Sequence, residues 1–106
     1  MWFCVAALSV SEHPDGSVQP HERLWEEHFS LIVADTADEA RAKAEKLARS
    51  EEGTYEAANG SSVSWEFKTV STVYQLDGAP ADGVEVFSRF LRDSEVQSLL
   101  TPFADN

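Results

Sequence analysis

The sequence predicts an α+β fold: an antiparallel sheet of about four strands, in the order β-β-α-β-β-α, with one long and one short helix packed on one face. Three observations support this prediction. Several segments alternate apolar with polar residues, which is typical of strands. One central segment carries apolar residues at helical spacing. The strands follow one another in pairs joined by turn-prone loops, which favours antiparallel pairing with the helices to one side.

The first two predicted strands differ in their patterns. Residues 2–10 are apolar at both even and odd positions, which indicates a central strand or one that is covered on both faces. A loop at 11–22 separates it from a second strand near 23–34. This second strand has the in/out pattern of an antiparallel strand with one wet face. Its apolar face carries Trp25, Phe29, Leu31 and Val33.

The helix signal is the strongest in the chain. Thr36 is followed three residues later by Glu39, the pattern of a capping box, and acidic residues suit the positive end of the helix dipole. We expect a helix near 37–50. Its apolar stripe consists of Ala40, Ala44, Leu47 and Ala48. Because most of this stripe is alanine, the helix can lie close to a sheet.

Residues 61–76 alternate cleanly at first and then change parity. We interpret them as one long strand with a bulge near Lys68-Thr69, because one extra residue lets both halves keep the same face. The shared face would then carry Val63, Trp65, Phe67, Val70, Thr72, Tyr74 and Leu76. The aromatic side chains in this row are expected to belong mostly to the core.

The remaining segments are predicted from turn and capping residues. Residues 51–60 read as a connection, and 77–83 as a hairpin loop that leads into a returning strand at 84–91. Asp93 or Ser94 is then expected to cap a short helix.

Size and charge limit the possible functions. The 106 residues suit a single domain over 1–106, with a frayed tail at 104–106. The net charge is -11, and a field of that sign repels phosphates, so we expect no nucleic-acid and no membrane binding. Trp65 and Phe67 could stack bases, but only Lys68 is at hand for the phosphates. One cysteine and no apolar run of about 20 residues indicate a cytoplasmic protein.

Several short motifs resemble those of a known bacterial family. They are the Trp2-Phe3 start, a strand that runs into Ala34 and an alanine-rich helix, W-E-F-x-x-V-x-x-V-Y at 65–74, and D-G-V-E-V-F-S-R at 82–89. The chain resembles the domain-of-unknown-function family DUF4288 over most of its length. The resemblance supports the fold. Since that family has no assigned activity, it implies no catalytic residues.

The sequence gives little support for a metal site or for a catalytic cysteine. His13, His21 and His28 do not have the spacing of a zinc site, so we expect no metal and no cofactor. Cys4 lies in an apolar strand, where a lone cysteine is usually a small core residue. The common phosphate-binding and acyl-transfer motifs are missing from the sequence.

Carboxylates on the strands leave an enzyme as one alternative. Glu26 and Glu66 lie on predicted polar faces, near His28, and Glu85 could join them. General acid–base catalysis would require these groups to converge in a cleft, so this hypothesis depends on their convergence. The simpler interpretation is that they keep the outer face of the sheet in water.

The leading hypothesis is a non-enzymatic protein-interaction module. One layer of two helices covers only one face of a sheet, so an apolar patch formed by Phe3, Val5 and Phe87 could bind a second copy or another protein. A more specific alternative is an immunity or inhibitor protein that masks a basic partner. The contact residues would then include Glu26, Glu66 and Glu85, together with His28.

Overall fold

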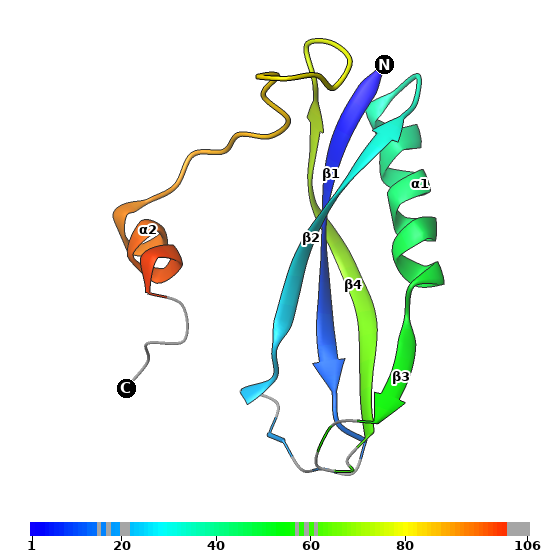
Figure 1. Ribbon diagram of the computed structural model, residues 1–106, viewed down its shortest axis with the longest axis vertical. Coiled ribbons are helices and arrows are strands. Elements are labelled where there is room, and N and C mark those ends of the chain that lie inside the picture. The colour runs from blue at the N-terminus through cyan, green and yellow to red at the C-terminus, as the bar shows by residue number, and fades with distance from the viewer. Residues whose placement is uncertain are drawn as a thin grey trace.

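The computed structural model describes residues 1–14, 16, 18–19, 22–56, 58, 60 and 62–101 (Figure 1). The predicted frayed tail at 104–106 lies outside these residues. The described chain forms an antiparallel sheet of order β2-β1-β4-β3 and two helices, which confirms the predicted α+β class. The elements are β1 (Trp2–Glu12), β2 (Trp25–Val33), α1 (Ala37–Ser50), β3 (Gly53–Glu56), β4 (Ser62–Gln75) and α2 (Asp93–Leu100).

Strand β1 is central and is buried on both faces, as its double apolar pattern predicts. It pairs with β2 along one edge and with β4 along the other. Alternate side chains point to opposite faces of a strand. Phe3, Val5 and Ala7 join the core beneath α1, whereas Cys4 and Ala6 are buried on the opposite face.

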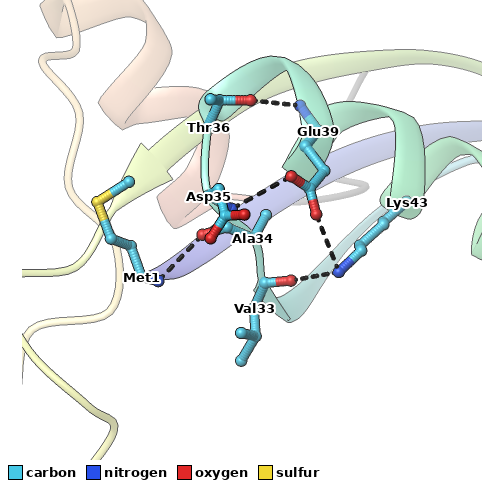
Figure 2. Close-up of polar contacts among 7 residues, drawn as sticks. All are labelled: Met1, Val33, Ala34, Asp35, Thr36, Glu39 and Lys43. Atoms are coloured by element: carbon cyan, nitrogen blue, oxygen red, sulfur yellow. Dashed lines mark hydrogen bonds and ion pairs between the residues drawn. The ribbon is translucent and has the colours of Figure 1, made fainter.

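Helix α1 begins and ends where the sequence predicts. The Thr36 hydroxyl accepts a hydrogen bond from the Glu39 amide, and the Glu39 carboxylate accepts one from the Asp35 amide (Figure 2). Lys43 ties the first turns to β2 by donating to the Val33 carbonyl at 2.7 Å, and it forms an ion pair with Glu39. The buried face consists of Ala40, Ala44 and Ala48. Their small methyl groups let the helix backbone approach the sheet.

Strand β4 is continuous and carries two bulges, whereas the sequence predicts one. Lys68 is the extra residue of the expected bulge, and Ser71 is the extra residue of a second one. The Ser71 hydroxyl donates to the Ala6 carbonyl of β1 at 3.3 Å. The second bulge restores the original parity, so Val73 continues the face of Val70, and the prediction that Thr72 and Tyr74 share that face is wrong.

The fourth strand is not the predicted one. Residues 84–91 contain no strand, and the short β3 pairs with the start of β4 instead. The segment 84–91 is extended, and its side chains contact one face of the sheet. It does not pair with a strand through backbone hydrogen bonds. The second helix also departs from prediction, because no side chain of α2 is buried and α2 stands away from the sheet (Figure 1).

The orientation of β2 is a further difference. Glu26, His28 and Ser30 lie on the side of the sheet that α1 covers, together with Ile32, which packs against the core. Its apolar row therefore lies on the opposite side.

Among the described residues, no helix has the length and apolar character that a membrane span needs.

Candidate interaction surfaces

Among the described residues, no helix covers the side of the sheet opposite α1, and we call this side the open face. Four apolar side chains of β2 form a row along it, here named the β2 row. Their exposed fractions are 51% for Trp25, 49% for Phe29, 45% for Leu31 and 50% for Val33. Four exposed apolar side chains on one face of a strand, with only Glu27 between Trp25 and Phe29, are unusual, because most exposed apolar residues are scattered singly.

Residues 84–101 form a C-terminal arm whose first part lies on the open face. The Phe87 ring packs edge-on against Phe29, with the ring centroids 5.1 Å apart, and against Tyr74 at 5.9 Å. The Tyr74 hydroxyl donates to the Glu85 carboxylate at 2.6 Å, and this bond raises the pKa of Tyr74. Arg89 forms an ion pair of 3.6 Å with Glu27 of β2. These contacts attach the base of the arm to its own sheet.

Beyond this base, the arm leaves its own sheet. Phe90 is fully exposed, and Leu99 and Leu100 are 55% and 70% exposed. Helix α2 makes no packing contact with α1 or with a strand in the described part of the chain. At its start, the Glu95 carboxylate accepts a hydrogen bond from the Arg92 amide, which with the Arg92 side chain lowers the Glu95 pKa. The distal arm, defined as Phe90 and α2, is thus a folded element without apolar support.

The three residues of the predicted apolar patch lie on two different faces of the sheet. Phe3 and Val5 are 2% and 1% exposed and form the core beneath α1, so they cannot contact a partner. Their alternation places them on the covered face. Phe87 does lie on the open face, as described above. The exposed apolar patch therefore consists of the β2 row, whose residues were expected on the buried face of the strand.

A second surface is an acidic hollow of about 280 Å³ at the C-terminal end of α1. It lies on the covered side of the sheet, past the last turn of the helix. The Ser9 hydroxyl and His28 Nε2 are 3.2 Å apart within it. Carboxylates come from β2 and from the segment after α1, and Trp65 forms one wall. The lining residues are Ser9, Glu26, His28, Ala48, Glu51, Glu52, Gly53, Thr54 and Trp65.

The structure brings together only part of the predicted acid–base group. Glu26 and His28 share the hollow, but Glu66 lies on the open face, opposite Val10 in the β1–β4 register, and pairs with Lys68 at 3.3 Å. Glu85 is bound to Tyr74. The four groups therefore do not converge in one cleft.

Glu51 and Glu52 are the lining residues that the sequence analysis misses. They fall in a segment interpreted only as a connection, and their place follows from the way the chain leaves α1 and enters β3. The Glu52 carboxylate accepts a hydrogen bond of 2.8 Å from the Phe67 amide, next to the bulge at Lys68. Glu52 thereby joins the end of the helix to β4.

The described residues contain no cluster of three metal-ligating side chains. His21 lies outside them, and His13 and His28 are not grouped with other ligands. Cys4 is buried, and burial raises the pKa of its thiol, which disfavours the reactive thiolate. This agrees with the interpretation of Cys4 as a small core residue.

Comparison with known proteins gives one match. A family model described as "Domain of unknown function (DUF4288)" matches residues 2–88. The match includes the sheet, α1 and residues 84–88 of the arm, and it ends before Arg89, Phe90 and α2. No curated protein and no solved structure matches the chain.

Proposed function

The chain belongs to the DUF4288 family, whose function is unknown, and we propose from its exposed surfaces that it is a non-enzymatic protein-interaction module. The surface that it uses is the open face. The observation that carries this proposal is the β2 row, in which four apolar side chains are each about half exposed. Apolar surface of this extent on a folded domain is typical of a contact site.

The surroundings of the β2 row also suit a protein interface. Charged side chains lie beside it: the Glu27–Arg89 pair crosses from β2 to the arm, and the Glu66–Lys68 pair lies on β4. An apolar centre with a polar, solvent-accessible rim is the usual arrangement of an interface. Trp25 and Phe29 are aromatic, and aromatic residues are enriched in such centres.

Site-specific photo-crosslinking in the host cell tests this function. A benzophenone amino acid at Leu31 is expected to give protein adducts, which a Trp25→Ser substitution in the same chain should reduce. The matched control carries the same group at Arg41, which is exposed on α1. Mass spectrometry identifies the second chain in each adduct. Equal or absent adducts at the two positions would show that the open face does not bind protein.

A second candidate function is contact with a basic partner at the acidic hollow. Glu26, Glu51 and Glu52 line it, in a chain of net charge -11, so a lysine or arginine side chain is the group that it would receive. This supports the inhibitor alternative from the sequence analysis. The carboxylate–histidine enzyme is not proposed, because Glu66 and Glu85 lie elsewhere.

Titration with a hexa-arginine peptide tests this second function. Binding is expected at low ionic strength, and it should weaken in 0.15 M salt because screening shortens the reach of the carboxylates. The double variant Glu26→Gln/Glu51→Gln should bind more weakly than Asp77→Asn/Asp82→Asn, which removes the same number of carboxylates at exposed positions outside the hollow. Equal losses in the two variants would mean that the peptide responds only to net charge.

A further inference from the structure

We propose that the occupant of the open face is a second copy of this chain: Phe90 and α2 of each protomer pack on the β2 row of the other. This inference rests on the proposed function, because it names the partner of the open face. The resulting contact is isologous, so the same two surfaces are used twice around a two-fold axis.

The chain exposes both halves of such a contact. In the β2 row, Phe29 contacts Phe87 of its own chain, yet all four side chains stay about half exposed. The distal arm is a set of apolar side chains without support. In one chain they do not meet, because α2 makes no packing contact with the described strands and stands apart from them (Figure 1). A second copy supplies the missing cover and the missing support at once.

The exposed apolar area is close to what a dimer needs. The residues concerned are Trp25, Phe29, Leu31, Val33, Val86, Phe90, Val96, Leu99 and Leu100. With side-chain areas on the order of 200 Å² for aromatic and 100 Å² for aliphatic residues, their exposed fractions correspond to roughly 700 Å² per protomer. Stable interfaces of standard size bury about 800 Å² per partner.

The base of the arm orients the distal part for binding. Phe87, Glu85 and Arg89 are each held by the open face of their own chain. Only Phe90 and α2 then remain to be ordered by the partner, which lowers the entropic cost of association. The chain is also extended, with a radius of gyration of 16.4 Å. A compact chain of about 100 residues has a radius of about 13 Å.

The charge of the chain sets the salt dependence of this dimer. Each copy carries a net charge of -11, so two copies repel each other while the contact itself is apolar. Added salt screens the repulsion and should strengthen the dimer. A basic partner at the acidic hollow would show the opposite dependence, so the two kinds of binding can be told apart.

Sedimentation equilibrium of the full chain tests the inference. We expect twice the chain mass of 11.7 kDa, with tighter association in 0.3 M than in 0.03 M salt. Phe90→Ser and Trp25→Ser should each weaken the dimer by about a hundredfold, since each contact is lost twice in a symmetric pair. The control Leu47→Ser changes an exposed leucine of α1 and should leave the dimer unchanged.

Mixing the two weakened variants gives a sharper result. A heterodimer of Trp25→Ser with Phe90→Ser retains one intact contact, between the unaltered arm of the first chain and the unaltered row of the second. The mixture should therefore associate more tightly than either variant alone. Urea unfolding of Phe90→Ser as a monomer checks its fold, which a fully exposed side chain is not expected to affect.

Three outcomes would overturn the inference. One is a monomer at millimolar concentration in both salts, and a second is a dimer that Phe90→Ser does not weaken. The third is a mixture of variants that associates no better than its components. If Leu31 then still crosslinks to a different protein, the open face remains an interaction surface and only the identity of its occupant is wrong.

Discussion

The two faces of the sheet differ in how they are covered. On the covered face, Phe3, Val5, Phe67 and Val70 are all less than 8% exposed beneath an alanine-faced helix. On the open face, an extended arm inserts one aromatic ring, Phe87, and four apolar side chains of β2 stay about half exposed. The covered face therefore holds most of the buried apolar surface that stabilises the fold, and the open face keeps apolar surface available for contact.

The largest expected effect comes from the covered face. Phe3→Ala should lower the free energy of unfolding by about 3–5 kcal/mol, because it removes a fully buried aromatic side chain and leaves a cavity. Phe90→Ala removes the same group from an exposed position and should change the unfolding of the monomer by less than about 0.5 kcal/mol. Urea denaturation of dilute protein measures both. Similar losses would mean that the two faces contribute alike to stability.

A smaller effect is expected at the start of α1, which holds the cover in place. Thr36→Ala removes the hydroxyl that accepts from the Glu39 amide and should cost about 1 kcal/mol of unfolding free energy. Thr36→Ser keeps this acceptor and should restore most of the loss. Thermal unfolding of the two variants provides the comparison. If the serine variant is as unstable as the alanine variant, the hydrogen bond is not the cause.

The smallest effect concerns the attachment of the arm to the open face. The hydrogen bond to Glu85 raises the pKa of Tyr74 above its ordinary value of about 10, so the folded chain favours the protonated phenol. Its contribution is complete below the ordinary pKa and is lost as the pH rises through the folded pKa. Absorbance at 295 nm should therefore show Tyr74 ionising at a higher pH than in Glu85→Gln.

The Tyr74→Phe variant is the control for this titration, because it isolates the second tyrosine of the chain. Subtracting its curve leaves the signal of Tyr74 alone. If Tyr74 ionises at the same pH with and without the Glu85 carboxylate, this contact does not hold the base of the arm.

Elements with local signals could be predicted from the sequence. Helix α1 has the predicted bounds because capping, dipole and periodicity all act within one segment. The double burial of β1 and the bulge at Lys68 also follow from local patterns. For α2, the bounds are close to prediction but the packing is not. The sequence of this short helix identifies its apolar side chains, but it does not determine which part of the fold they contact.

The two candidate surfaces could not be predicted from such patterns. Alternation in β2 identifies two faces, but which of them meets α1 depends on where the helix lies. Alternation in 84–91 is the same for a strand in the ladder and for a segment lying across a face. The acidic hollow joins residues from all four strands and from the end of α1, so no single segment carries its signal.

The paired bulges of β4 have a consequence for how this strand can change during evolution. Lys68 and Ser71 are each one residue more than the partner strand requires, and each inverts the parity of the residues after it. Deleting either one would remove its bulge and leave Val70 and Val73 on the covered face, because every other residue of β4 keeps its partner on β1. A deletion within a regular stretch would instead turn the residues on one side of it to the other face. Single-residue gaps in this strand should therefore fall at these two positions among related sequences. The spacing of Phe67, Val70 and Val73, three residues apart, is the mark that the two extra residues leave in this chain.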